Sequence, residues 1–454
     1  MIDLLIRNGL LVDPVDGVYA GDIGVQNGRI AAIYAPGFEP AAREAIDASG
    51  KYVFPGVIEP HTHMGFKRSF AEDVRSESGA AAIGGITTFM SFHRHYQSAR
   101  PMPYDDFPEL RETIEQESHI DMGIHLGILT ESQLRELERY IDWGVSSFKF
   151  YMAYRGADGK TVGMINEIDD GVMFEGFQVL GRHPHTQACV HCENTEIIAR
   201  HVARARAEGR DSLAAWNAAR PAFAEAEHVR RAGFFAELTG ANLYYVHIGA
   251  EIGLEEALRH RERYDRLTVE TCPHYLMVCE DDDHIGNLAK VNPPVRTAAD
   301  RERMWSGLAN GEIATVGTDH CATTRAQKGG TIWEAAAGFP GMTTLLPVLL
   351  SDGYHKRGLP LQRIAQVTSY NVARAFNMPH KGTLRVGADA DLAIVDLDLE
   401  QEVRPQDYGS ASDFSILEGQ KLKGWPLRTI LRGKTVAIDG RLVGSPGDGS
   451  FVAR

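Results

Sequence analysis

The chain has 454 residues, of which 43% are hydrophobic and 24% are charged, the balance of an ordinary soluble globular protein. This length suits about two or three domains, and single α/β barrels also reach it. The formal net charge of −14 argues against a broad nucleic-acid surface, because phosphate binding needs clustered Lys and Arg. We therefore expect a small-molecule substrate and no nucleic-acid partner.

The N-terminal residues and the cysteines indicate a cellular compartment. Residues 1–9 contain no basic stretch followed by an apolar core, so we expect no signal peptide. The sequence has no run of about 18 apolar residues, so we expect no membrane-spanning helix. Five cysteines are an odd number and fit a reducing cytoplasm better than a disulfide framework. Cys189 and Cys192 form a CxxC, but no second pair follows at zinc-ribbon spacing, so we interpret them as buried thiols.

The two ends of the chain share a β-rich pattern. Residues 2–52 alternate apolar and polar positions between turn signals, and the pattern returns after residue 387. Neither end has enough strands for an independent core. We predict that residues 1–53 and 383–454 pair into one small β-sandwich domain, which flanks a catalytic domain over residues 54–382.

The middle of the chain alternates β-rich runs with helical patterns, which is typical of βα units and a parallel sheet. Residues 133–141 and 227–238 have apolar positions at helical spacing, and Gly144 and Gly240 follow them as stop signals. The eight expected strands cover residues 57–63, 86–92, 121–129, 146–152, 187–193, 242–248, 267–276 and 313–320. This alternation predicts an α/β fold, a (β/α)8 TIM barrel whose active site lies at the C-terminal ends of the strands.

Polar residues stand at the ends of five of these strands. They are His61 and His63 on the first strand, Lys149 on the fourth, His191 on the fifth, His247 on the sixth and Asp319 on the eighth. Two histidines two apart on a strand face the same side, so both can reach one metal ion. A lone buried histidine is more often a satisfied core residue. Six polar residues at corresponding places in one barrel are hard to explain in that way.

Four imidazoles and one carboxylate suit zinc-type ions, and they exceed the needs of one tetrahedral site. We therefore expect two divalent ions, with Zn²⁺ as the first choice. Burial and two nearby dications would lower the pKa of Lys149 and favour its free amine. A free amine can add CO₂ and form a carbamate whose two oxygens can bridge two metals. The alternative for Lys149 is a structural ion pair or a contact with a substrate anion, and the five neighbouring ligands favour the carbamate.

At this point the sequence resembles the amidohydrolase superfamily, and within it the cyclic-amide hydrolases: hydantoinase/dihydropyrimidinase, allantoinase and dihydroorotase. The resemblance covers nearly the whole chain. Its motifs include Glu59-Pro60-His61-Thr62-His63, Ser147-Phe148-Lys149, Val190-His191-Cys192-Glu193-Asn194, Tyr245-Val246-His247, Asn292-Pro293-Pro294-Val295-Arg296 and Gly317-Thr318-Asp319-His320-Cys321. The resemblance implies a carbamylated lysine that bridges two metals. It implies that His61, His63 and Asp319 hold one ion and that His191 and His247 hold the other.

The residues and the resemblance together predict a mechanism. A bridging hydroxide, with its pKa lowered by the metals, attacks the ring carbonyl. Asp319 takes the hydroxide proton and passes it to the departing ring nitrogen. By resemblance, Tyr154 donates a hydrogen bond to the developing oxyanion, and Asn292 contacts the substrate amide. Without the resemblance, Tyr154 would be interpreted as a tyrosine packed at the barrel rim.

The substrate is the least determined part of this prediction. Similar dihydroorotases carry an Arg two residues after the second histidine, whereas Met64 and Gly65 follow His63 here. The Asn292-Pro293-Pro294 motif is nevertheless closer to the dihydroorotase and allantoinase branches. We predict hydrolysis of a hydantoin, a dihydropyrimidine or a related cyclic imide or ureide. A dihydroorotase- or allantoinase-type enzyme, a hydrolase of acyclic amides or esters, and a non-catalytic scaffolding paralogue are the alternatives.

A second His-x-His pair, His93 and His95, ends the expected second strand. We do not assign it to the metal pair, because both of those sites already have their ligands. Arg94 or His93 is a candidate contact for an anionic or carbonyl-rich part of the substrate, and solvated residues at the pocket mouth are the alternative. The resemblance implies a homotetramer or homodimer, and the tail over residues 400–454 is a candidate for reaching a neighbouring subunit.

Overall fold

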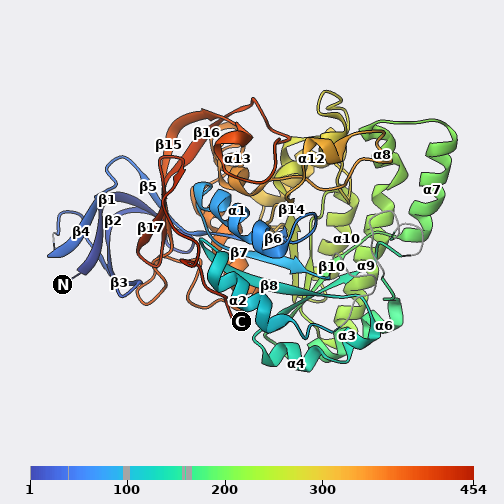
Figure 1. Cartoon of the computed structure of the whole chain (residues 1–454), viewed down its shortest axis with the longest axis horizontal. Coiled ribbons are helices and arrows are strands. Elements are labelled where there is room, and N and C mark those ends of the chain that lie inside the picture. The colour runs from blue at the N-terminus through green and yellow to red at the C-terminus, as the bar shows by residue number, and fades with distance from the viewer. Residues whose placement is uncertain (1, 39, 96–102, 156–158, 160–165) are drawn as a thin grey trace.

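The computed structural model describes residues 2–38, 40–95, 103–155, 159 and 166–454. Within these residues the strands form two sheets of nine strands each. Figure 1 shows one sheet at the left of the molecule and the other, surrounded by helices, at the right. The first chain segments and the last strands lie together at the left.

The left sheet is composite, because both ends of the chain contribute to it. Its strands are β1 (Ile2–Asp13), β2 (Gly17–Gln26), β3 (Arg29–Tyr34), β4 (Ala42–Asp47), β5 (Tyr52–Pro55), β15 (Leu392–Glu402), β16 (Lys421–Leu431), β17 (Lys434–Ile438) and β18 (Arg441–Leu442). The two ends meet where β5 pairs antiparallel with β15, with Val53 opposite Ile394. Both residues belong to one buried apolar cluster. The predicted β unit from both chain ends is therefore confirmed, while its boundaries at residues 53 and 383 stay a prediction.

The right sheet is a closed parallel barrel. Its strands are β6 (Val57–His63), β7 (Ile86–His93), β8 (Asp121–Ile128), β9 (Ser147–Tyr151), β10 (Gln187–His191), β11 (Leu243–Tyr245), β12 (Leu267–Thr271), β13 (Thr315–Val316) and β14 (His320–Cys321). They pair in the order β13-β12-β11-β10-β9-β8-β7-β6-β14. Since β13 and β14 are consecutive short pieces of one segment, their pairing with β12 and β6 closes the ring. The predicted TIM barrel is confirmed.

Three of the expected strands, the sixth, seventh and eighth, differ most from the structure. The sixth covers only Leu243–Tyr245, and the seventh ends at Thr271, so the prediction of strand up to residue 276 was wrong. Pro273 begins the short helix α11 (Pro273–Met277), because its fixed φ and missing N–H suit a first helical turn. The eighth strand is divided at Asp319, whose φ of 53° interrupts the extended backbone.

Helices surround the barrel in Figure 1. Besides α11 they are α1 (Phe70–Ile83), α2 (Phe107–Glu117), α3 (Glu131–Leu134), α4 (Leu137–Asp142), α6 (Asp170–Gly181), α7 (Thr195–Ala207), α8 (Leu213–Ala219), α9 (Ala222–Thr239), α10 (Glu251–Arg261), α12 (Ala298–Ala309), α13 (Leu345–Val348), α14 (Leu361–Ala365) and α15 (Asn371–Ala375). Two π-helical segments, Leu349–Lys356 and Gln366–Tyr370, flank α14. The helix expected over residues 133–141 is divided into α3 and α4, whereas the one expected over 227–238 lies inside α9, which Gly240 ends in a left-handed conformation.

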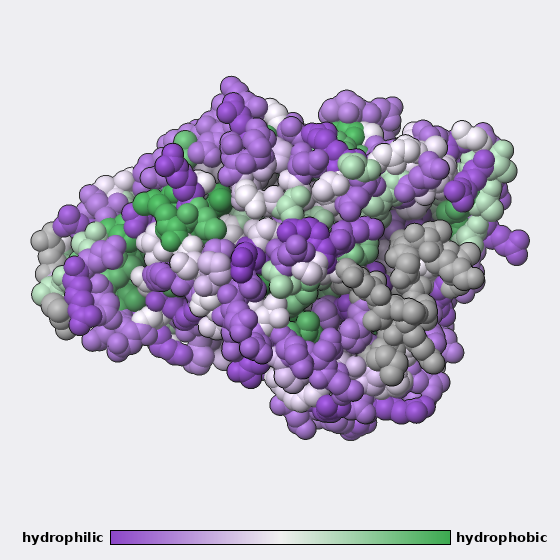
Figure 2. Space-filling view, viewed as in Figure 1, coloured by the Kyte–Doolittle hydropathy of each residue, from purple (hydrophilic) through white to green (hydrophobic). Residues whose placement is uncertain are grey.

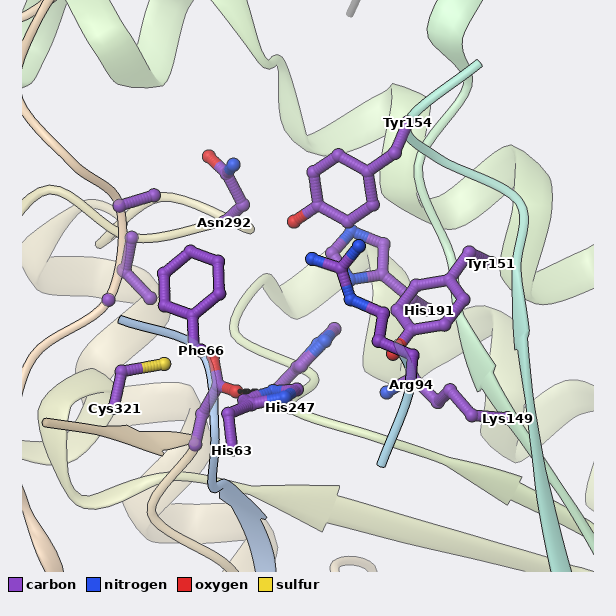
Figure 3. A pocket seen from close by; sticks show the side chains of 14 residues that line it. His63, Phe66, Arg94, Lys149, Tyr151, Tyr154, His191, His247, Asn292 and Cys321 are labelled. Atoms are coloured by element: carbon purple, nitrogen blue, oxygen red, sulfur yellow. Dashed lines mark hydrogen bonds and ion pairs between the residues drawn. The ribbon is translucent and has the colours of Figure 1, made fainter. Parts of the chain in front are cut away.

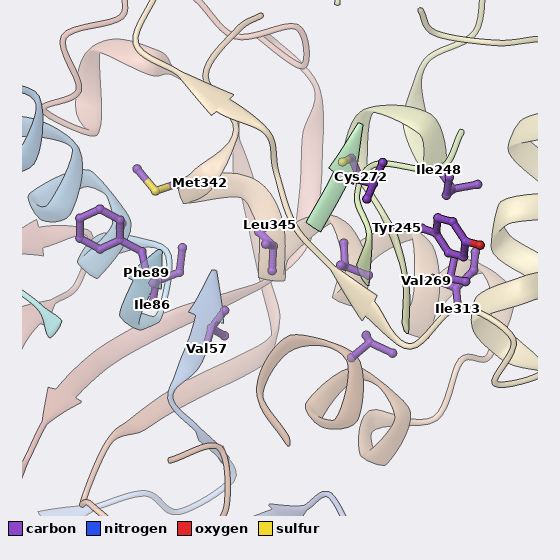
Figure 4. Packing of buried hydrophobic residues seen from close by; sticks show 14 of the residues in the cluster. Val57, Ile86, Phe89, Tyr245, Ile248, Val269, Cys272, Ile313, Met342 and Leu345 are labelled. Carbon is purple, nitrogen blue, oxygen red and sulfur yellow. The ribbon is translucent and has the colours of Figure 1, made fainter. Parts of the chain in front are cut away.

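Alternating strand residues supply two apolar clusters. Phe89 of β7 belongs to the larger cluster beneath the helices, while its neighbour Met90 belongs to a second cluster with Phe92 and Tyr244. Figure 4 shows labelled members of the larger cluster, among them Phe89 and Val269. The barrel is therefore packed on both faces of its strands.

The last residues of the chain pack against the other end of the barrel. Met122 of β8 donates its N–H to the Ser450 carbonyl at 3.0 Å, and Val452 returns an N–H to the Met122 carbonyl at 2.9 Å. The Arg454 guanidinium donates to the Ile124 carbonyl. This part of the tail therefore contacts the barrel of its own chain.

The face shown in Figure 2 is mainly hydrophilic, and its largest hydrophobic area lies toward the composite sheet. Among the helices of the described segments, none combines the length and the apolar character needed to cross a bilayer.

Candidate active site

A pocket of about 590 Å³, its open mouth included, lies at the C-terminal ends of the barrel strands. Its lining includes eight residues singled out from the sequence: His63, Arg94, Lys149, Tyr154, His191, His247, Asn292 and Asp319. His61 adjoins this set, because its Nε2 lies 3.1 Å from the Asp319 carboxylate. Figure 3 shows the labelled lining residues, among them His63, Lys149 and His191, around this pocket. The structure thus brings the whole predicted set together.

The first candidate metal group is His61, His63 and Asp319, whose ligand atoms lie within 4.8 Å of one another. One Asp319 oxygen lies 3.1 Å from His61 Nε2 and 2.9 Å from His63 Nε2. Burial alone would raise the pKa of Asp319, but the two imidazoles hold it well below its usual value. Two imidazoles and an ionised carboxylate at this spacing fit a zinc-type ion.

Glu270 orients the first histidine of this group. One Glu270 oxygen accepts from His61 Nδ1 at 2.7 Å and from the His247 backbone N–H at 2.9 Å. Because Nδ1 of His61 carries that hydrogen bond, Nε2 is the atom left to face the site. Tyr244 donates to the other Glu270 oxygen at 2.8 Å, so the carboxylate is fixed from both sides.

The second candidate group centres on His191 and His247, whose ring centroids are 4.5 Å apart. Glu193 lies 2.7 Å from His191 Nε2, which leaves Nδ1 of that ring for the site. Arg220 donates to both Glu193 oxygens, at 2.9 and 2.6 Å. Burial would raise the pKa of Glu193, but the Arg220 guanidinium outweighs it and lowers the pKa strongly. A buried anion is therefore kept ionised behind His191.

Lys149 lines the same pocket as the two groups and is only 1% exposed. Its Nζ lies 4.3 Å from the centre of the Phe92 ring, and burial lowers its pKa to about 8. Among the residues that the structure describes, no carboxylate forms an ion pair with this amine. The structural ion pair considered for Lys149 is therefore not seen there. Without Lys149, the second group has only two candidate metal ligands, the imidazoles of His191 and His247.

Four further side chains surround the pocket mouth in Figure 3. The Tyr154 hydroxyl and the Arg94 guanidinium point inward from one side, and Asn292 and Phe66 lie on the other. The Tyr154 ring lies 5.0 Å from the His191 ring. The buried side-chain oxygen of Asn292 has no hydrogen-bond partner among the described residues. The Asn292 side-chain oxygen is therefore available to a ligand.

Several residues of this site were missed in the sequence. The carboxylates Glu59, Glu193 and Glu270 are each at most 1% exposed. Glu59 accepts the backbone N–H groups of His61 and Thr318, at 2.7 and 3.0 Å. A signal was present for Glu59 and Glu193, because each is an acidic residue in an apolar run two residues from a ligand histidine. No such signal marked Phe66, whose place depends on the path of its loop.

Comparison with known proteins identifies the family. The model of the amidohydrolase family matches residues 52–436. The chain belongs to the amidohydrolase family. This amidohydrolase is 34% identical to the L-hydantoinase of Paenarthrobacter aurescens, over 100% of its own chain and 98% of that protein. It is 35% identical to an allantoinase of Rubrobacter xylanophilus, over 99% and 97% of the two chains.

Solved structures agree with this assignment. The L-hydantoinase (dihydropyrimidinase) of Arthrobacter aurescens superimposes with a TM-score of 0.93 at 33% identity, over 100% of both chains. The dihydropyrimidinase of Brevibacillus agri gives 0.89 at 29% identity, over 100% and 99%. The predicted family, fold and hydrolytic enzyme class are confirmed, and residue groups suited to the metal dependence of this family are present.

Proposed function

We propose that this amidohydrolase opens a cyclic amide ring by hydrolysing its C–N bond, with a hydantoin, a dihydropyrimidine or a related cyclic imide or ureide as substrate. The observation that carries the proposal is the meeting of four imidazoles, Asp319 and the buried Lys149 at the base of one pocket. The names hydantoinase, dihydropyrimidinase and allantoinase among the relatives support the ring substrate.

The proposed cofactors are two divalent ions, with Zn²⁺ as the expected metal, and a carbamate on Lys149. His61, His63 and Asp319 would hold one ion, His191 and His247 the other, and the Lys149 carbamate would contact both. Two bound divalent ions supply a hydroxide near neutral pH and polarise the substrate carbonyl. The burial of Lys149 supports the carbamate, because it favours the free amine that reacts with CO₂.

Residues of the chain supply the remaining steps in this proposal. Asp319 accepts a proton as the nucleophile adds, and transfers it to the ring nitrogen as the C–N bond breaks. Tyr154 donates a hydrogen bond to the carbonyl oxygen as negative charge develops there, a contact of a kind worth about 3 kcal/mol. Asn292 binds the substrate amide, and Arg94 contacts an anionic or carbonyl-rich part of the substrate.

A substrate panel tests this function. Metal-loaded enzyme is incubated with dihydrouracil, substituted hydantoins, allantoin, dihydroorotate and cyclic imides, and ring opening is followed by chromatography. We expect turnover of at least one ring substrate and none of acyclic amides. Turnover of acyclic amides alone, or of no member by a fully metal-loaded protein, would contradict the proposal.

A lysine variant tests the carbamate. Lys149→Ala should abolish ring opening, and small carboxylates such as acetate or propionate should restore part of it by taking the place of the carbamate. Full activity of this variant would refute the assignment. Metal analysis of the wild type should give about two zinc-type ions held by the active site.

An allantoinase-type reaction is the second candidate. The Asn292-Pro293-Pro294 motif and the allantoinase relative at 35% identity favour it. The dihydroorotase alternative is less well supported, because this chain has Gly65 where similar dihydroorotases carry an arginine. The allantoin and dihydroorotate members of the panel decide between these outcomes.

We also propose a homotetramer or homodimer in the cytoplasm. Phe223, Phe234 and Leu238 on α9 are 50%, 50% and 59% exposed, and their spacing places them along one helix face. The five cysteines are all free and buried, which suits a reducing compartment. Sedimentation of the wild type and of Phe234→Asp measures the assembly state, and a wild-type monomer would contradict this part of the proposal.

A further inference from the structure

The second His-x-His pair, His93 and His95, is not used by the active site described above. His93 is the last residue of β7, and neither histidine belongs to the pocket lining, although Arg94 between them does. Side chains alternate along an extended segment, so the two histidines share the side opposite to Arg94. They therefore form a separate pair behind the pocket wall.

Asp106 joins this pair from another part of the chain. It precedes α2 as the N-cap residue, but its side chain makes no capping hydrogen bond. Instead its carboxylate lies 3.1 Å from His95 Nε2. Ligand atoms of His93, His95 and Asp106 all lie within 4.8 Å of one another. Neighbouring ligand atoms around a tetrahedral zinc are about 3.3 Å apart, so the three groups would move closer together to bind one ion.

The surroundings of the His93 side chain indicate a ligand from outside the protein. Its side chain is buried, and neither ring nitrogen has a hydrogen-bond partner among the described residues. Aromatic rings surround it instead, with the Phe70 ring 5.3 Å and the Tyr104 ring 5.8 Å away. A buried polar group without a partner is destabilising, so binding of a ligand to this imidazole would be favourable. Burial also keeps the imidazole neutral, the form that binds metal.

We propose that His93, His95 and Asp106 bind a third divalent cation of the zinc type, separate from the active-site pair. Two imidazoles and one carboxylate are a donor set for borderline ions, and they leave at least one position for water. The Asp106 side chain is 46% exposed, so the ion can enter from solvent. Once bound, it would join the end of β7 to the start of α2 and brace the segment that carries Arg94.

Metal counting by equilibrium dialysis against a fixed free Zn²⁺ concentration tests this site. Asp106→Asn and His95→Gln change partly exposed side chains, and each should bind one ion fewer per chain than its parent. The same loss of one ion is expected in the Lys149→Ala background, in which the active-site pair is disturbed. A failure of the binuclear proposal is thereby distinguished from a failure of this one.

His183→Gln is the matched control. His183 also pairs with a carboxylate, Glu138, at 2.6 Å on the surface, but no third ligand completes that pair among the described residues. This variant should bind as many ions as its parent. If Asp106→Asn and His95→Gln also keep the full count, with circular dichroism unchanged, the third site is overturned.

Discussion

Three pocket residues have a left-handed backbone, although none of them is glycine. Tyr154, His247 and Asp319 have φ values of 61°, 42° and 53°. Such conformations cost on the order of 1–3 kcal/mol each, and they persist only where the surroundings impose them. Glu270 binds the His247 backbone N–H, and Glu59 binds that of Thr318 beside Asp319. The buried carboxylates thus hold the backbone of the site as well as its imidazoles.

The Glu193–Arg220 pair leads to a prediction about metal affinity. Glu193→Gln should weaken zinc binding about 10- to 100-fold, because the amide orients His191 less well and adds no charge to its ring. Competition with a chromophoric chelator measures this change. Glu196→Gln, at an exposed position of α7, is the control and should leave the affinity unchanged. Equal affinities of the two variants would show that Glu193 does not support the site.

The lowered pKa of Lys149 predicts how carbamate formation depends on pH. With a pKa of about 8, the free amine should rise from about 10% at pH 7 to about 90% at pH 9. At a constant concentration of dissolved CO₂, carbamate in the metal-free protein should increase over this range. Its ¹³C NMR signal, taken as the difference between the wild type and Lys149→Ala, measures it. A signal that does not change between these pH values would contradict the assignment.

Arg94 should influence which substrates are accepted. We expect Arg94→Gln to raise KM about 10-fold for substrates with an anionic or carbonyl-rich substituent, and to leave unsubstituted rings nearly unaffected, because a charged hydrogen bond contributes about 1.5–3 kcal/mol. Steady-state kinetics over the substrate panel measure this. Arg135→Gln, at the residue that follows α3, is the control, because this side chain is 73% exposed. An unchanged order of substrates would remove the proposed role.

Much of the site could be predicted at the scale of residues. The candidate metal ligands could be predicted because they stand at the ends of the expected strands in the sequence. The strand ends of a parallel barrel meet at one face. Arg220 could not be predicted, since it meets Glu193 from 27 residues away through helix packing. The left-handed backbone of Asp319 was also hidden, because no glycine marked it.

At the scale of elements, the C-terminal tail forms backbone hydrogen bonds with Met122 near the start of β8. A Cβ added to Gly449 would lie 2.0 Å from the Ile120 carbonyl oxygen. Gly449→Ala should therefore displace the tail and lower the free energy of unfolding by about 1–3 kcal/mol. Chemical denaturation followed by fluorescence measures the change. Val443→Ala, at a residue 52% exposed in the same tail, should have little effect, and equal losses would contradict the proposed fit.

Element boundaries were less predictable than their order. The apolar runs located all eight barrel strands, since each run is buried. The runs could not show where backbone pairing stops, because residues past the end of a strand are also buried by the site. This explains the short β11 and the divided eighth strand.

At the scale of the whole molecule, Lys381 joins the barrel to the composite sheet. Its Nζ lies 2.7 Å from Asp121 at the start of β8 and 2.6 Å from Asp391 just before β15. Lys381→Met should lower the free energy of unfolding by about 3–5 kcal/mol, because it leaves the buried Asp391 carboxylate without its side-chain cation, although Arg432 still pairs with Asp121. Calorimetry and denaturant titration measure the loss.

The control for this variant is Lys421→Met. Lys421 is 69% exposed and lies 3.8 Å from Glu400, so its loss should change stability by no more than about 0.5 kcal/mol. Similar destabilisation by the two variants would show that the buried Lys381 ion pairs stabilise the fold no more than an exposed ion pair does. The β pattern at both chain ends could be predicted from the sequence, but this link could not, because Lys381, Asp121 and Asp391 form no periodic pattern.

The pairing of β5 with β15 also has a consequence during synthesis. Lys51 and Asp396, which form an ion pair beside this pairing, are 345 residues apart. At ribosomal rates of about 5–20 residues per second, the later residue follows the earlier one by roughly 20–70 seconds. Throughout this delay the apolar edge of β5 has no partner from the end of the chain. A nascent chain of this amidohydrolase is therefore most exposed to aggregation, and most dependent on chaperones, before β15 emerges.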